Sequence, residues 1–269
     1  MRVLRKRIKS LFQITHTLFI LDNINFVLAY LKGYRKNRKF RKANPDFRLP
    51  PDYFLYETYR LDYNQYKEDG NLSAKEVFEW TSRYLPKDLT VLEWGCGVSR
   101  AIRHFPEYAS AGSTFFACDI NARMIEWNKR NIEKVTFETI HYIPPTNYPN
   151  DSFDLVYAFS VFTHIEKNLQ QNWINEISRI IKPGGIFLFT THGRAYFDKL
   201  DRAGLTQLSA EGAYTISYHQ KGHRMMSTYN TYDAFKQLVG QRFTVLEYYD
   251  GAANREKVGG QDLWIVRKL

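Results

Sequence analysis

Short apolar runs alternate with amphipathic stretches through the middle of the chain. Five runs have the length of buried strands, at residues 90–94, 114–118, 135–140, 153–159 and 186–191. Between them, residues 121–132 and 167–181 carry apolar side chains at helical spacing. Strands that alternate with helices in this way predict a parallel sheet covered by helices on both faces.

After residue 191 the alternation stops. Residues 192–230 are rich in Gly, His, Tyr and Ser, and we expect them to form an insertion on the substrate side of the domain. A helix at 231–239 then leads to strands at 242–249 and 261–267. A Gly-containing loop joins these two strands, which predicts an antiparallel hairpin.

A helix is also predicted ahead of the first strand. Ser73 and Glu76 form a capping box that predicts a helix over Ser73–Leu85, which Pro86 ends. Residues 43–72 contain prolines followed by closely spaced tyrosines. That composition predicts a linker followed by an aromatic helix or lid.

Charge divides the chain near residue 48. Residues 1–48 hold 13 Lys/Arg and 2 Asp/Glu, a net charge of +11, whereas residues 49–269 hold 25 and 26, a net charge of −1. We therefore expect a basic amphipathic N-terminal extension over 1–48 and a main domain over 49–269. The +10 of the whole chain belongs to the extension and does not by itself indicate a nucleic-acid-binding domain.

The extension has basic clusters at both ends of an apolar segment. Arg2–Lys9 and Lys32–Lys42 flank Leu11–Leu31, which Asp22 interrupts, so a membrane-spanning helix is not expected. The arrangement favours peripheral contact of residues 1–42 with an anionic membrane surface. The alternative is a helix packed on the domain with solvated charges at its ends.

Cysteine usage bears on location. Cys96 and Cys118 lie within predicted core segments, and no zinc-ligand spacing occurs. A cytoplasmic, reducing location is expected, with the inner face of the membrane as the site of any peripheral contact. No metal is expected, and the oligomeric state does not follow from the sequence.

The richest chemistry lies at the ends of the first two strands. Glu93 is followed by Gly95 and Gly97, and glycines at a strand end allow a turn whose backbone N–H groups approach a ligand closely. Asp119 closes the second strand, where its carboxylate can accept hydrogen bonds from both ribose hydroxyls. Carboxyl ends of neighbouring parallel strands meet at one edge of a sheet, so a nucleoside-bearing cofactor is predicted there.

Four signals in this order resemble the class I S-adenosylmethionine (SAM)-dependent methyltransferases. They are the Glu-x-Gly-x-Gly loop at 93–97, Asp119, the run Asp151–Val156 and the run Lys182–Gly185. The resemblance implies a Rossmann-like, doubly wound α/β fold with a mostly parallel seven-stranded sheet and a C-terminal antiparallel hairpin. Phe159–Ile165 and Thr190–Gly193 are similar to a bacterial subgroup that modifies glycans or small molecules.

By this resemblance, SAM is the cofactor and its contacts come from three strand ends. The expected cofactor-binding residues are Glu93, Gly95, Cys96, Gly97, Asp119, Ile120, Met124, Phe159 and Ser160. Glu93 and the loop backbone would hold the methionine end, Asp119 the ribose, and Ile120 with Met124 the adenine.

The chain departs from the family pattern at two places. Ser99 replaces the third glycine of the loop, and no acidic residue near His141 matches the one often found beside adenine. An NAD site is the alternative for such a loop. Arg100 at the third position of the Gly-x-Gly-x-x-Gly fingerprint and the terminal hairpin both count against it.

Methyl transfer to a hydroxyl benefits from a general base, and histidine suits this role near neutral pH. His164 follows the fourth strand and His192 follows the fifth, so both are predicted at the ligand-binding edge. Either is a candidate base, with Glu166 as a lesser candidate. The alternative for each histidine is a structural role at a strand end.

The expected acceptor is a hydroxyl or amine of a small molecule or glycan. The fourth strand ends in Ala158-Phe159-Ser160 rather than the Asn/Asp-Pro-Pro-Tyr of base-methylating enzymes, and the main domain has no excess positive charge. No nucleic acid is therefore expected as a partner. The alternative is a non-catalytic protein with this fold that binds RNA through its basic extension or joins an enzyme complex.

Overall fold

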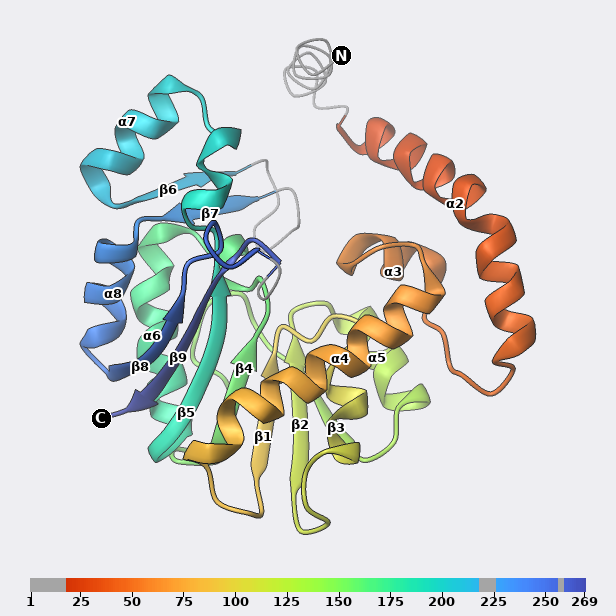
Figure 1. Cartoon of the computed structure of the whole chain (residues 1–269), viewed down its shortest axis with the longest axis horizontal. Helices are drawn as coiled ribbons and strands as arrows, with labels where there is room; N and C mark the ends of the chain where they lie inside the picture. Colours follow the sequence, from red (N-terminus) through yellow and green to blue (C-terminus); the bar gives the residue numbers. More distant parts are fainter. Residues whose placement is uncertain (1–17, 218–225, 256–258) are drawn as a thin grey trace. The chain divides into compact units, whose positions relative to one another are not determined.

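A computed structural model of the chain describes residues 18–217, 226–255 and 259–269 (Figure 1). The chain divides into two compact units, 1–68 and 69–269, which are described separately below. The Arg2–Lys9 cluster and the start of the apolar segment lie outside the described residues. The predicted boundary near residue 48 stays a prediction.

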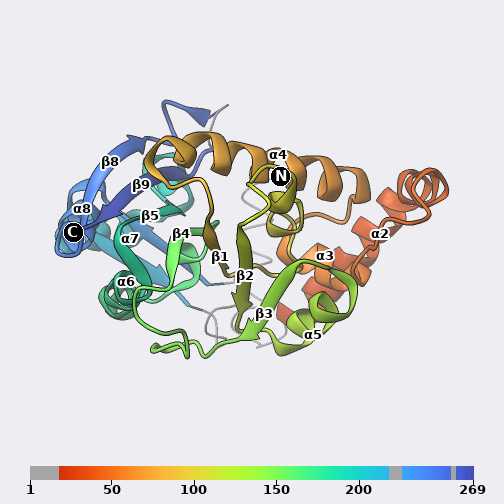
Figure 2. The same ribbon diagram turned by 90° about the horizontal axis from the view of Figure 1, so that it is seen from below.

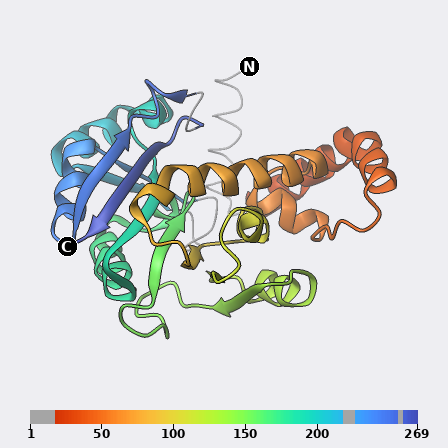
Figure 3. The ribbon, with the colours of Figure 1, turned by 60° about the horizontal axis from the view of Figure 1, so that its bottom comes forward.

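The larger unit is built on a seven-stranded sheet with the order β3-β2-β1-β4-β5-β9-β8. Its strands are β1 Thr90–Trp94, β2 Thr114–Asp119, β3 Val135–Thr139, β4 Phe153–Ala158, β5 Ile181–Thr191, β8 Phe243–Tyr249 and β9 Asp262–Lys268. The first five are parallel, whereas β9 runs antiparallel to both β5 and β8 (Figure 3). The predicted fold class is confirmed.

Helices cover both faces of this sheet. They are α4 Tyr63–Thr81, α5 Ala122–Asn131, α6 Lys167–Ile180 and α8 Tyr232–Gly240, with short 3₁₀ turns η1 Ser82–Tyr84, η2 Ile102–Glu107 and η3 Phe162–His164. Trp173 of α6 and Phe235 of α8 belong to one buried apolar cluster, whereas Val77 of α4 and Ile125 of α5 belong to a second. The helices thus form two layers, with α4 along one side of the sheet and α6 and α8 on the other (Figure 2).

The helix expected to start at Ser73 begins ten residues earlier, so that prediction was wrong. The Ser73 hydroxyl donates to the Asp69 carbonyl, 2.7 Å away, from inside α4 and does not cap it. Gly70 also lies within the helix, where a Cβ would come 2.3 Å from the Arg100 carbonyl oxygen. A capping box is a local signal, and here tertiary contact with the Arg100 segment overrides it.

The fifth strand also begins earlier than expected. Lys182–Gly185, predicted to end the helix before a strand at 186, is part of β5, and Ile181 already pairs with Phe153. The register then shifts before Leu155 pairs with Ile186. Gly184 has φ +77°, a conformation that favours glycine, so the strand accommodates the irregularity instead of ending.

Residues 192–230 contain regular elements that the sequence did not reveal. They are η4 Arg194–Lys199, α7 Arg202–Glu211 and the antiparallel pair β6 Ala213–Ile216 and β7 Ser227–Asn230. Asp201 caps α7 by accepting from the Gly204 amide at 2.8 Å, and Gly212 ends it with φ +71°. The small sheet and α7 lie at one end of the large sheet (Figure 1).

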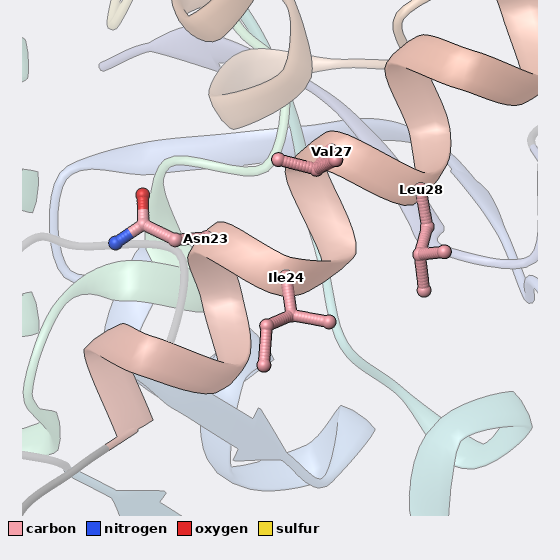
Figure 4. A pocket seen from close by; sticks show the side chains of 4 residues that line it. All are labelled: Asn23, Ile24, Val27 and Leu28. Atoms are coloured by element: carbon pink, nitrogen blue, oxygen red, sulfur yellow. The ribbon is translucent and has the colours of Figure 1, made fainter.

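The smaller unit contains α2 Leu18–Ala43, α3 Asp52–Thr58 and the start of α4. Phe26 packs edge-on against Tyr53, and Asn37 donates to the Leu61 carbonyl at 3.2 Å. On the other side of α2, Ile24 and Leu28 are exposed by 49% and 59% (Figure 4). No helix among the described residues has the length and apolarity that a membrane crossing needs.

Candidate active site

The carboxyl ends of β2, β1, β4 and β5 form one continuous edge, because these strands are parallel neighbours. Asp119 ends β2, and the glycine turn at 95–97 follows β1. Ser160 follows β4, and His192 follows β5. Residues far apart in sequence are thereby brought together where open α/β sheets bind ligands.

The turn after β1 requires left-handed backbone at several positions. Gly95 and Gly97 have φ +77° and +51°, and Ser99 has φ +56°. At Gly95 a Cβ would lie 2.3 Å from the Val161 Cγ2, so only glycine fits. Ser99 keeps the left-handed conformation that a glycine normally supplies, at a cost of about 1 kcal/mol or more. The serine therefore leaves the turn's third left-handed position in place.

Asp119 is held at the mouth of this turn. Its two carboxylate oxygens accept from the Gly97 and Asn121 amides, each at 2.8 Å. A carboxylate oxygen can accept a second hydrogen bond, so the group suits ribose hydroxyls. Ile120 exposes 40% of its surface, whereas Met124, a residue of α5, is buried. The acceptor oxygens of Asp119 suit the ribose of SAM, and the contacts of Ile120 and Met124 with adenine stay predictions.

Glu93 lies deeper, at the end of β1. It is buried, and its Oε2 accepts from the Ile102 amide at 3.0 Å, which ties η2 to the strand. Burial raises the pKa of Glu93 to about 7, although the Ile102 hydrogen bond and the positive charge of Arg100 oppose the rise. The Glu93 side chain thus links β1 to η2, the 3₁₀ helix that follows the glycine turn.

Replacing Glu93 by Gln tests this burial. A folded-state pKa of about 7 lies above the unfolded value of 4.5, so the wild-type protein loses stability as pH rises from 4.5 through 7. Gln is neutral at every pH, so the variant does not lose this free energy of unfolding, which amounts to roughly 3 kcal/mol above pH 7. In urea unfolding, the free energy of unfolding of Glu93→Gln should rise relative to that of the wild type between pH 5 and pH 8. A difference that does not change with pH would contradict the shift.

Three further residues support the turns after β1 and β4. Asn128 of α5 donates to the Gly97 carbonyl at 2.9 Å. Thr190 accepts from the Ser160 amide at 2.8 Å, and the Gln261 side chain donates to the Ser160 hydroxyl at 2.8 Å. Thr190, a polar residue at the end of an apolar strand, was the only one with a recognisable sequence signal.

Ser160 and Phe159 both follow β4. Ser160 has φ +63°, and its bonds to β5 and to the segment before β9 hold this strained turn in place. The Phe159 ring packs against Tyr157 at 5.8 Å. The turn after β4 therefore lies beside the glycine turn, where Val161 comes close to Gly95, and the contact of Phe159 and Ser160 with SAM stays a prediction.

His164 sits in η3, just past the turn. Its Nδ1 lies 2.7 Å from the Met226 carbonyl oxygen, an atom that only accepts hydrogen bonds, so Nδ1 carries the proton. In the neutral ring Nε2 then has the lone pair. Glu166 precedes α6, and its amide donates to the Tyr142 hydroxyl at 3.2 Å. The Nδ1 bond thus joins η3 to the segment before β7, and a role for His164 as a base stays a prediction.

His192 differs from His164 in its surroundings. The ring stacks on Tyr196 at 4.2 Å and is 8% exposed. Burial lowers the pKa of His192 to about 3, with further contributions from His164 and Lys199. The ring is therefore neutral at physiological pH.

Both cysteines are free and buried, and burial raises the pKa of Cys96 and of Cys118. Their thiols stay protonated and pack as small apolar groups. Within the described residues, no group of three or more His, Cys, Asp or Glu could hold a metal ion.

The structure contains a glycine turn, a carboxylate at the next strand end and an antiparallel final pair, the features by which the sequence resembles class I SAM-dependent methyltransferases. Residues 92–189 match the family model described as "Methyltransferase domain". The chain therefore carries such a domain, and the predictions of this enzyme class and of SAM as cofactor are confirmed. The assignment of individual site residues stays a prediction.

Solved structures share the fold. A SAM-dependent methyltransferase from Methanosarcina mazei is 20% identical with a TM-score of 0.54, covering 71% of this chain and 97% of that one. A 1,6-didemethyltoxoflavin-N1-methyltransferase from Burkholderia thailandensis, solved with S-adenosylhomocysteine, is 18% identical with a TM-score of 0.52, covering 75% and 79%. At these identities the likeness shows the fold alone.

Curated relatives overturn one prediction. The tRNA N(3)-cytidine methyltransferase METTL2 of Bos taurus is 30% identical over 112 residues, covering 39% of this chain and 30% of that protein. Human METTL6, of the same description, is 25% identical over 150 residues, half of each chain. The chain thus spans about a third to a half of these relatives.

The expectation that no nucleic acid takes part was wrong, because these relatives are named for a tRNA substrate. The two arguments behind it were too narrow. The Asn/Asp-Pro-Pro-Tyr motif marks one group of base methyltransferases, and its absence does not exclude others. The net charge of residues 49–269 ignored the +11 of residues 1–48, which can supply phosphate contacts.

Proposed function

We propose that the protein transfers the methyl group of SAM to an oxygen or nitrogen atom of an acceptor bound at the carboxyl ends of β4 and β5. The observation that carries the proposal is the pair of histidines at this edge, His164 after β4 and His192 after β5. The two rings are close enough for His164 to lower the pKa of His192. The residues expected to bind the cofactor lie at the ends of the neighbouring strands β1 and β2.

The chain contributes mainly alignment and proton transfer. SAM supplies, when bound, a methyl group whose bond to sulfur breaks with both electrons staying on sulfur, as a lone pair of the acceptor atom forms the new bond to carbon. Asp119 and the turn at 95–97 orient the donor. The His164 Nε2 accepts the proton that the acceptor atom gives up.

Two classes of acceptor have support. A glycan or small-molecule hydroxyl or amine is supported by the similarity of Phe159–Ile165 and Thr190–Gly193 to a bacterial subgroup with such substrates. An RNA acceptor is supported by the names of the curated relatives and by the exposed cations of α2. Those are Lys32, Arg35, Lys36, Arg38, Lys39, Arg41 and Lys42.

A transfer assay with SAM labelled in its methyl group tests the proposal. Purified protein is incubated with total cellular RNA and, separately, with a glycan and small-molecule extract. Label that ribonuclease releases identifies RNA, and label that resists it in the second extract identifies a glycan or small molecule. If neither fraction gains label above the level of Asp119→Ala protein, the proposed activity is wrong.

Measuring the affinity for the acceptor at several salt concentrations separates an RNA acceptor from a neutral one. If RNA is the acceptor and α2 binds it, the apparent affinity should fall steeply with ionic strength, because each phosphate contact releases counterions. Exchanging Lys32, Arg35 and Lys39 for Gln should flatten that dependence without changing the affinity for S-adenosylhomocysteine. A neutral acceptor predicts no such dependence.

A further inference from the structure

Arg100 ties the glycine turn after β1 to helix α4. It directly follows Ser99, the last of the left-handed residues of this turn. Its Nη1 donates to the Asp69 carbonyl at 2.8 Å and to the Ser73 hydroxyl oxygen at 2.9 Å. Both acceptors lie on α4, so the guanidinium joins the end of the turn to the helix.

Gly70 lets α4 approach the backbone of the same arginine. A Cβ at position 70 would come 2.3 Å from the Arg100 carbonyl oxygen and 3.1 Å from its carbonyl carbon. Close-packed segments transmit such a collision instead of absorbing it, so a side chain here would push the helix and the turn apart. A glycine inside a helix lowers its stability relative to alanine, and the close approach of the two backbones explains why one stands here.

A second helix also holds the glycine turn. Asn128 of α5 donates to the Gly97 carbonyl at 2.9 Å. The Ser99 amide donates to the Cys96 carbonyl at 2.7 Å, which closes the turn immediately before Arg100. The turn is therefore held from α5 through Asn128 and from α4 through Arg100.

We propose that Arg100 is a positioning residue for the methyl donor, and that residues 69–73 of α4 fix the glycine turn in the conformation that binds SAM. The effect acts through the turn, because the fraction of molecules in the binding conformation sets the apparent affinity. This inference rests on the proposed function, in which the turn at 95–97 orients the donor. It gives a share in cofactor affinity to α4, a helix outside the family match at 92–189.

Gly70→Ala separates the stability of α4 from the position of the turn. Alanine is the better helix former, so this exchange ordinarily stabilises a helix. Here the new Cβ displaces the Arg100 backbone, and the affinity for S-adenosylhomocysteine should fall about 10-fold or more. Isothermal titration calorimetry measures the affinity at a temperature at which circular dichroism shows the variant to be folded.

Gly240→Ala is the matched control. Gly240 is the last residue of α8, and a Cβ there would meet nothing within 4 Å. The same exchange of glycine for alanine in a helix should therefore leave the affinity for S-adenosylhomocysteine unchanged.

Substitutions at both ends of the hydrogen bonds test the role of the side chain. Arg100→Met removes the donors but keeps a long unbranched side chain, and should weaken S-adenosylhomocysteine binding about 10-fold. Arg100→Lys keeps a charged donor and should recover part of that loss. Ser73→Ala alters no charge, so its effect reports the hydrogen bond alone. That effect should largely vanish in combination with Arg100→Met, because the two residues act through one contact.

Wild-type affinity in Gly70→Ala, or in Arg100→Met, overturns the inference. So does a lower melting temperature of Arg100→Met without a change in affinity, because the contact would then serve stability alone. If Gly70→Ala does not fold, Arg100→Met and Ser73→Ala decide the question. Absence of S-adenosylhomocysteine binding in the wild-type protein would instead defeat the proposed function, so the two failures are distinguishable.

Discussion

Replacing His164 by Asn is expected to lower kcat by about 10²–10⁴-fold, the usual contribution of a general base. The Asn amide can still donate to the Met226 carbonyl in place of Nδ1, so η3 keeps its anchor to β7. The variant loses only the Nε2 lone pair that receives the proton. Initial rates with methyl-labelled SAM at saturating acceptor measure the effect.

His104→Asn is the control for effects that follow from replacing any histidine by Asn. His104 lies on η2 and pairs with Glu107, and His104→Asn should leave kcat within about threefold, because no transition-state contact is lost. Calorimetry should give His164→Asn the wild-type affinity for S-adenosylhomocysteine. A His164→Asn enzyme with nearly full kcat would show that the proton leaves by another route.

Asp119→Ala is expected to weaken S-adenosylhomocysteine binding by about 100-fold or more. Two hydrogen bonds from ribose hydroxyls to a charged carboxylate are lost, each contributing roughly 1.5–3 kcal/mol. The Gly97 and Asn121 amides also lose their acceptor, which loosens the turn. Isothermal titration calorimetry measures the change directly.

Glu126→Ala is the control for Asp119. Glu126 lies on α5, the helix that follows β2, and pairs only with exposed Arg130, a contact worth little. Its removal should leave ligand affinity unchanged. Asp119→Asn, which keeps one acceptor oxygen, should fall between alanine and wild type. Equal affinity in Asp119→Ala and wild type would place the ribose elsewhere.

Local patterns predicted the fold well where one force dominates. A parallel strand buried on both faces must be apolar throughout, and β4 is buried along its whole length. A helix was expected over residues 121–132, and Asn121, a residue type that favours the N-cap, accepts from the Met124 amide at 3.3 Å. These signals depend on neighbours in sequence, so sequence reveals them.

Predictions were wrong where distant segments meet. The helix was expected to begin at Ser73, yet Gly70 already lies inside α4, where a Cβ would come 2.3 Å from the Arg100 carbonyl oxygen. Ser73 reads as a cap but bonds within the helix. The β6–β7 pair was missed, since its residues are only partly apolar and gain their partners from η3 and from each other.

In the candidate site, too, the sequence revealed local features but not the contacts between distant segments. Glu93 was expected to hold the methionine end of SAM, which stays a prediction, and what the sequence did not reveal is that its Oε2 accepts from the Ile102 amide. Asn128 and Gln261 support the crevice from α5 and from the segment before β9. No spacing in the sequence relates them to Gly97 or Ser160, because the contacts span 31 and 101 residues.

By itself, the sequence determined the alternating architecture, the glycine turn and the carboxylate at the end of the second strand, and with them the class of cofactor. These follow from the period of apolar residues and from backbone angles that favour glycine, both of which are local properties. Tertiary structure decided the protonated nitrogen of His164. Its Nδ1 donates to the Met226 carbonyl, 62 residues away in the sequence, and only folding brings the two together.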